Sequence, residues 1–150
     1  AVIPCTVMVV ADKEREGQTR RTSSYGTTGQ YPIHVNMPEV QASSTEIADI
    51  IGIEITDKGT ALYMGVVNPG QQDTWYSINK GTYLVDKATG KKYTLKSTEN
   101  CEIAPKRSTL PAGYQTEFVL YFPSVPASVT TLDLCEPTDT GWKFTGIRVQ

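Results

Sequence analysis

The chain has 150 residues, of which 39% are hydrophobic and 20% charged, and its formal net charge is −2 at neutral pH. A single domain of this size buries enough apolar surface to fold without a metal ion or a dense set of disulfides. The small negative charge argues against nucleic-acid binding, which needs concentrated positive charge. Valine, isoleucine, threonine and tyrosine recur along the chain, and no window shows the apolar period of a helix. These features predict an all-β fold.

The N-terminal region, residues 1–30, has two parts. Residues 1–11 read AVIPCTVMVVA, which fits either an N-terminal strand with Pro4 near a sheet edge or the remnant of a secretory signal peptide. This run is too short to span a bilayer. Residues 13–30 are polar and rich in Gly, Ser and Thr, which predicts a flexible linker. We therefore expect the β-sandwich domain to occupy residues 31–150.

The first part of that domain predicts three strands, the last two forming a hairpin: residues 31–36, 46–56 and 60–67. By the two-residue period of a strand, Ile51, Ile53 and Ile55 are expected on one face. Gly52 inside this strand predicts a bulge. The next turn is expected at Asn68-Pro69-Gly70, because Pro sets φ and Gly accepts a positive φ.

The middle of the domain predicts a short strand and then a second hairpin: residues 75–78, 82–86 and 91–96. Tyr83 and Val85 alternate with polar neighbours, as do Tyr93 and Leu95, which is typical of an antiparallel sheet with one buried face. Three lysines of this hairpin could protect a sheet edge from pairing with other strands: Lys91, Lys92 and Lys96.

The C-terminal part carries the densest apolar pattern, with three strands between Pro- and Gly-containing turns. The residues expected to face the core are Phe118, Leu120, Phe122, Leu132, Leu134, Trp142, Phe144, Ile147 and Val149. Gly146 is expected to allow a bend within the last strand. The whole pattern predicts an antiparallel, immunoglobulin-like β-sandwich of about eight to ten short strands without a substantial helix.

Four tracts occur in order in this region: TYLVDKATGKKYTL, GYQTEFVLYFPSVP, LDLCEP and GWKFTGIRV. Together they resemble a family of uncharacterised β-sandwich modules of secreted or envelope proteins from Gram-negative anaerobes, sometimes found ahead of thioredoxin-like or hydrolase domains. The resemblance runs from Val40 to Val149, and it departs from the pattern at Cys135, where an aliphatic residue is expected. It implies a secreted, periplasmic or cell-envelope location. It carries over no catalytic residue.

Few residues of the sequence are suited to catalysis or metal binding. His34 is the one histidine of the sequence, so a Ser-His-Asp or Cys-His arrangement could form only around it, and its position between Ile33 and Val35 indicates a structural role. The three cysteines lack the short spacing of a zinc site. We expect neither an enzyme nor a cofactor.

Two further groups of polar residues allow alternatives. Cys101 and Cys135 are the pair expected to form a disulfide if one is present, and otherwise all three cysteines are free thiols. Asp133, Glu136 and Asp139 are best interpreted as a solvated acidic turn, with calcium binding as the alternative.

The candidate ligand-binding residues are Trp75, Tyr76 and Tyr114, because exposed aromatic rings can stack on sugars or anchor a protein partner. For Trp75, a core position in its strand is the favoured alternative. We expect a non-catalytic accessory or interaction module that binds through its loops and exposed strand edges. A carbohydrate-binding module is the second hypothesis. The expected partner is a protein or a glycan, with no nucleic acid and no membrane span in this chain.

Overall fold

A computed structural model describes residues 29–150 of the chain. All of its regular elements in that range are strands, and the range contains no helix that could cross a membrane. The twelve strands are β1 (Ile33–Asn36), β2 (Ala42–Ser43), β3 (Ala48–Ile55), β4 (Thr60–Val67), β5 (Thr74–Tyr76), β6 (Tyr83–Asp86), β7 (Lys92–Thr94), β8 (Ser97–Glu99), β9 (Ser108–Leu110), β10 (Gln115–Phe122), β11 (Thr131–Cys135) and β12 (Lys143–Arg148).

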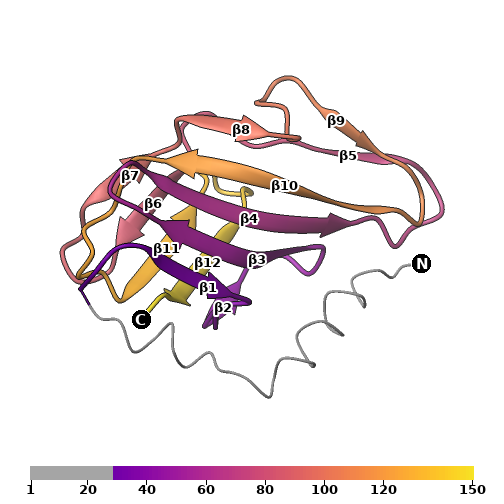
Figure 1. The fold of residues 1–150 in the computed structure, drawn as a ribbon. Helices are drawn as coiled ribbons and strands as arrows, with labels where there is room; N and C mark the ends of the chain where they lie inside the picture. Colours follow the sequence, from indigo (N-terminus) through magenta and orange to yellow (C-terminus); the bar gives the residue numbers. More distant parts are fainter. Residues whose placement is uncertain (1–28) are drawn as a thin grey trace, which may run out of the picture.

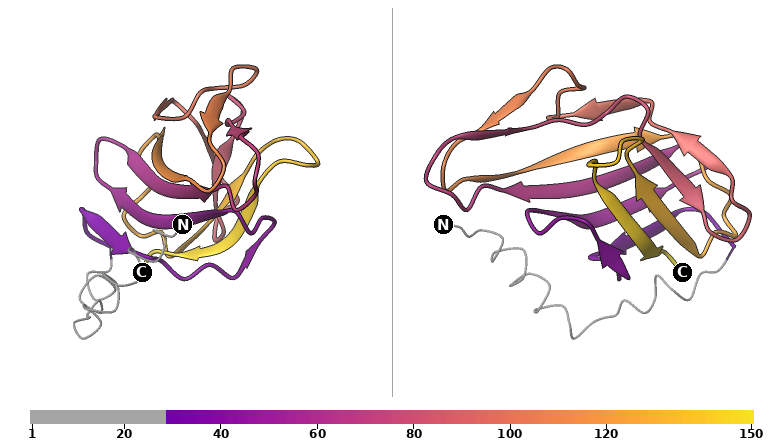
Figure 2. Two further views of the ribbon diagram at one scale, coloured as in Figure 1. Left: turned by 90° about the vertical axis from the view of Figure 1, so that its right-hand side faces the viewer. Right: turned by 180° about the vertical axis from the view of Figure 1, so that it is seen from behind.

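Two five-stranded antiparallel sheets form the body of the molecule (Figures 1 and 2). The first sheet has the order β1-β3-β4-β10-β8, and the second has the order β2-β12-β11-β6-β7. A separate two-stranded ribbon, β5–β9, runs beyond β10 at one side of the molecule (Figure 1). The prediction of an all-β antiparallel sandwich without a substantial helix is therefore confirmed.

The core consists of the inward side chains of the two sheets. Phe118, Leu120 and Phe122 of β10 are almost completely buried, and so are Leu132 and Leu134 of β11. Each of these sets follows the two-residue period of its strand, so alternation in the sequence is enough to identify the core face. Most of the C-terminal prediction is confirmed in the same way, because Phe144, Ile147 and Val149 are buried. Trp142 is only partly buried but packs against this core.

Strand β3 contains the bulge that Gly52 predicts, with a register shift against β4 between Ile50 and Gly52. The bulge inserts one extra residue, so it changes which side chains face inward. Ile50 is buried beside Ile53 and Ile55, whereas Ile51 is only partly buried. The prediction that Ile51 shares a face with Ile53 and Ile55 is wrong for this reason.

The hairpin of β6 and β7 also differs from the prediction. Leu84 is completely buried, whereas its neighbours Tyr83 and Val85 are half-buried on the opposite face. Tyr93 of β7 is buried as predicted. The expected strand 91–96 is also divided, because the chain leaves the second sheet after β7 and enters the first sheet as β8. A pattern of alternation does not report this change of sheet.

The sandwich has four edge strands, β1 and β8 in the first sheet and β2 and β7 in the second. Lys92 lies on the edge strand β7, where a lysine hinders pairing with another chain. The predictions for residues 1–28, namely a strand or leader and most of a linker, lie outside the described residues, as does Cys5.

Candidate functional site

Strand β5 places two adjacent aromatic residues on opposite sides of the ribbon. Tyr76 is 5% exposed, whereas Trp75 is 49% exposed. The ring of Tyr76 stacks on Phe118 with 5.5 Å between ring centroids, and its hydroxyl donates a 2.9 Å hydrogen bond to the carbonyl of Asn100. Because successive side chains of a strand point in opposite directions, burial of Tyr76 turns Trp75 outward.

The prediction that Tyr76 is a surface residue for ligand binding is therefore wrong. Its ring packs the ribbon against the sandwich core. The pKa of its hydroxyl is raised, mainly by burial. The alternative of a core Trp75 is also wrong, since half of that side chain is exposed.

Arg107 covers Trp75. Its guanidinium carbon lies 4.0 Å from the centre of the indole ring, which is the geometry of a stacked cation–π contact. Arg107 comes from the loop just before β9, and the register that pairs Trp75 with Thr109 brings it into place. Arg107 and Thr109 are two residues apart and so share a face. Sequence reasoning missed Arg107 because its contact depends on the β5–β9 register.

Tyr114 is the most exposed of the large hydrophobic side chains described, at 64%. Its backbone is fixed by the loop that ends β4, because Asn68 N–H donates to the carbonyl of Tyr114 at 2.9 Å and Gly113 N–H donates to the carbonyl of Asn68 at 2.9 Å. The Asp73 carboxylate accepts a 3.0 Å hydrogen bond from Ala112 N–H and joins the two loops. Tyr114 thus lies at an end of the ribbon whose backbone is held by hydrogen bonds.

The buried side chain of Asn68 holds this end of the ribbon together by hydrogen bonds. The residue is buried, and its side-chain amide donates to the carbonyls of Gln72 at 2.8 Å and Leu110 at 3.0 Å. Its side-chain oxygen accepts from Gly70 N–H at 3.0 Å, as the expected Asn-Pro-Gly turn requires. Trp75 and Arg107 of the ribbon, together with Tyr114 on the loop after β9, are called the ribbon surface below.

Cys101 and Cys135 are both free thiols, so the alternative without a disulfide between them holds for these two residues. Leu132 and Leu134 of β11 face the core, so Cys135 points to the outside of the second sheet, whereas Cys101 is buried. Burial, with smaller contributions from Glu136 and Glu102, raises the pKa of the Cys101 thiol to about 12. That thiol is therefore protonated and unreactive near neutral pH.

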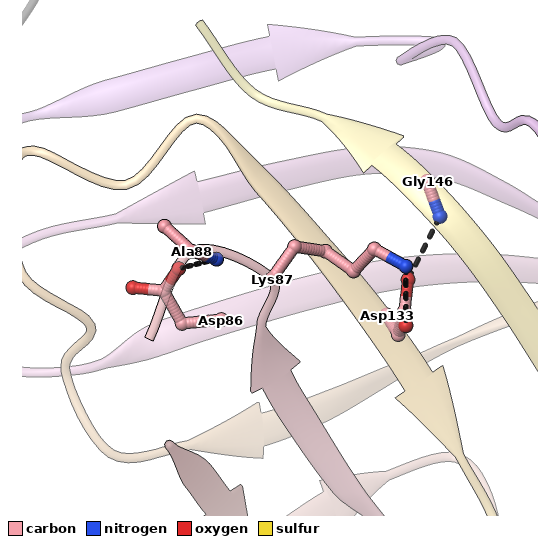
Figure 3. A network of polar contacts seen from close by, with 5 residues as sticks. All are labelled: Asp86, Lys87, Ala88, Asp133 and Gly146. Atoms are coloured by element: carbon pink, nitrogen blue, oxygen red, sulfur yellow. Dashed lines mark hydrogen bonds and ion pairs between the residues drawn. The ribbon is translucent and has the colours of Figure 1, made fainter. Parts of the chain in front are cut away.

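Asp133 within β11 and Glu136 just after it have structural partners, and Figure 3 shows those of Asp133. Asp133 accepts a 2.9 Å hydrogen bond from Gly146 N–H and lies 3.4 Å from the ammonium group of Lys87. The two oxygens of Glu136 accept hydrogen bonds from Asn79 N–H at 2.9 Å and Trp142 N–H at 2.7 Å. No group of three potential metal ligands exists within residues 29–150, and the calcium alternative gains no support.

His34 is exposed on the edge strand β1, opposite Glu54 in the register. An open hollow of about 290 Å³ lies at the nearby β3–β4 hairpin, with Glu54, Lys58, Lys96 and Tyr121 among its lining residues. His34 does not line it. This hollow therefore does not join the histidine to a carboxylate or a serine.

Comparisons with protein-family models, curated proteins and solved structures give no match to this chain. The ribbon surface is the candidate site that the geometry itself supplies.

Proposed function

We propose that this chain is a non-catalytic interaction module that binds a protein partner through the ribbon surface. The observation that carries the proposal is the half-exposed indole of Trp75 held under the Arg107 guanidinium. Exposing a large aromatic ring to water is unfavourable. The same strand buries Tyr76, so an aromatic residue on it need not be exposed, and the exposure of Trp75 calls for a function.

The residue types also support this assignment. Trp, Tyr and Arg are the residues most enriched among those that dominate protein–protein binding energy. Stacking on Arg107 restricts the indole, and the hydrogen-bonded loops restrict the backbone of Tyr114. Less conformational entropy is then lost when a partner binds, which favours affinity.

The partner's chemistry follows from Arg107. Its guanidinium carbon lies 4.0 Å over the Trp75 ring, and the N–H groups of a guanidinium can form a paired hydrogen bond with a carboxylate. We expect the partner to present an apolar group to the aromatic rings and a carboxylate beside it. The resemblance to envelope modules favours a secreted or periplasmic partner, and no cofactor is needed.

The test is comparative capture from a cell-envelope extract with the wild-type chain, Trp75→Ala and Arg107→Ala. A protein captured by the wild type and lost with both variants would support the proposal. Ile47→Ala removes another exposed apolar side chain, 38% exposed and outside the ribbon, and should keep the partner. Equal capture by all four chains would contradict the proposal.

A carbohydrate-binding module is the second candidate, favoured by the exposure of both Trp75 and Tyr114. Sugar rings stack on aromatic faces largely independently of charge. A glycan-array signal that disappears with Trp75→Ala but is unchanged with Arg107→Ala and at high salt would favour this function over the first. A silent array, together with capture that requires Arg107, would favour a protein partner.

A further inference from the structure

The two outer faces of the sandwich carry opposite charge. The five strands of the first sheet contain no Lys or Arg, and their acidic residues are Asp49, Glu54, Glu99 and Glu117. All four lie on the outer side of that sheet, since the residues next to them in each strand face the core. We name the outer side of the first sheet the acidic face.

Register places these carboxylates around a central strip of small and aromatic residues. Glu54 pairs with Ala61 and Glu99 pairs with Val119, while Asp49 and Glu117 both pair with Gly65. The strip itself consists of Ala61, Tyr63, Gly65, Val119 and Tyr121.

A tyrosine holds one of the carboxylates in place. The Tyr121 hydroxyl donates a 2.7 Å hydrogen bond to Glu99. Tyr63 lies near Glu54, and burial together with that carboxylate raises the pKa of the Tyr63 hydroxyl. The bond to Glu99 keeps negative charge over the sheet at a fixed position, so a partner would lose less side-chain entropy on binding there.

The outer side of the second sheet has the opposite character. Lys92, Lys143 and Arg148 lie there on β7 and β12, and all three are exposed. The one outward carboxylate on these strands is Asp133, which is paired with Lys87 (Figure 3). Arg148 forms an ion pair at 3.6 Å with Glu39, which lies before β2. We name this side the basic face.

The basic face also has an aromatic and aliphatic centre. Cys135 pairs with Tyr83 and with Lys143 on its two sides, and Val85 pairs with Lys92. The ammonium group of Lys92 lies 4.7 Å from the centre of the Tyr83 ring. Each face therefore combines a half-buried centre with charges mostly of one sign, with Lys58 and Lys96 bordering Glu54 and Tyr121 on the acidic face.

We propose that the acidic face of one copy of this chain docks on the basic face of a second copy. The two faces belong to opposite layers of one sandwich and carry complementary charge, so a second copy satisfies both at once. With a net charge of −2, whole copies repel each other only weakly. Because the contact joins two different surfaces, it is heterologous and leads to a ring or an open row of copies.

The size of the contact sets its strength. Five strands about 4.8 Å apart and five or six residues long give a flat face of roughly 400 Å² per partner. Such an area belongs to weak or transient interfaces. The association is expected to depend on concentration and to weaken about tenfold or more from about 0.01 M to about 1 M ionic strength, where the screening length falls from about 30 Å to about 3 Å.

The test uses two neutralised versions of the full chain in sedimentation equilibrium. The first carries Asp49→Asn, Glu54→Gln, Glu99→Gln and Glu117→Gln, and the second carries Lys92→Gln, Lys143→Gln and Arg148→Gln. Glutamine can still accept a tyrosine hydrogen bond, so the fold is retained, and circular dichroism of each variant checks this. At low ionic strength the wild type is expected to increase in mass with concentration, and each variant alone to stay monomeric.

An equal mixture of the two variants gives the sharpest result. The intact basic face of the first and the intact acidic face of the second should form a 1:1 pair that does not grow further. A mixture that stays monomeric, a wild type that is monomeric at all concentrations, or variants that associate like the wild type would each overturn the proposal.

Two controls separate this inference from the ribbon surface. Glu102→Gln with Lys106→Gln neutralises exposed charges outside both faces and should associate like the wild type. Trp75→Ala should also keep self-association. Loss of self-association in Trp75→Ala would mean that the ribbon, and not the faces, joins the copies.

Discussion

The sandwich core and the β5–β9 ribbon contain aromatic side chains in opposite environments. Phe118 in the core is 1% exposed and stacks between Tyr76 and Trp142, with ring centroids 5.5 and 6.2 Å apart. Trp75 on the ribbon is half exposed and contacts a cation. One short strand thus places Tyr76 in the core, where it stabilises the fold, and leaves Trp75 exposed on the surface.

The largest expected effect comes from the core side of this comparison. Phe118→Ala removes a fully buried ring and should lower the free energy of unfolding by about 3–5 kcal/mol, from lost transfer energy and the cavity that remains. Chemical denaturation followed by circular dichroism measures the loss. A loss below about 1 kcal/mol would show that the ring is not packed as described.

The buried thiol predicts a pH dependence. The pKa of Cys101 is raised from 9.0 to about 12 in the folded protein, so its contribution to stability is complete below pH 9 and is lost as the pH rises toward 12. The contribution is at most roughly 4 kcal/mol, at about 1.4 kcal/mol for each pKa unit. Burial also raises the pKa values of Tyr76 and Tyr93, which act in the same direction from about pH 10.

Denaturation curves between pH 8 and 12 measure this effect, with Cys101→Ala as the comparison. The variant should lose less stability over this range than the wild type, whatever its stability at pH 8. Parallel losses in the two chains would mean that Cys101 is not buried in the native state.

Two glycines, one in β12 of the sandwich and one in a surface loop, allow the same substitution to be compared at a crowded and an open position. Gly146 and Gly90 both have positive φ, at 69° and 77°. Alanine costs about 1–2 kcal/mol at such a position. A Cβ at Gly146 would also lie 2.5 Å from the Cβ of Gln41, whereas nothing lies within 4 Å at Gly90.

Gly146→Ala should therefore destabilise the protein more than Gly90→Ala, by about 1 kcal/mol or more. Thermal unfolding of the two variants measures the difference. Equal losses would show that the contact between β12 and Gln41 adjusts without cost.

The smallest effect is expected on the ribbon. Trp75→Ala removes an exposed ring and one cation–π contact of about 0.5–1 kcal/mol, so the free energy of unfolding should change by no more than about 1 kcal/mol. The same denaturation assay as for Phe118→Ala applies. A loss as large as that of Phe118→Ala would make Trp75 a structural residue and weaken its assignment to binding.

The sequence predicted the fold class and most of the core because alternation is a local property. The strands of Phe118 and Leu132 have a strict two-residue period, and both lie in the core as predicted. The failures occur where this period is interrupted or ambiguous. The bulge at Ile51 changes the parity within β3, and at Leu84 apolar residues occupy both faces of the strand, so alternation could not choose between them.

The candidate site was predicted in part. The exposure of Tyr114 agrees with the prediction, whereas the half-exposed Trp75 contradicts the core position favoured for it. The role of both residues in binding stays a prediction. Tyr76 could not be separated from Trp75 by sequence, because adjacent aromatic residues leave open which one faces the core. Arg107 lies 32 positions from Trp75 in the numbering, and only strand pairing brings them together.

Local sequence patterns are enough to specify an antiparallel β-sandwich, since residue periodicity and turn chemistry act over a few neighbouring residues. Other features arise only from the tertiary fold. It assigned β7 and β8 to different sheets, kept Cys101 and Cys135 apart and gathered charge of opposite sign on the two outer faces. These properties depend on pairing between distant strands, which no local pattern encodes.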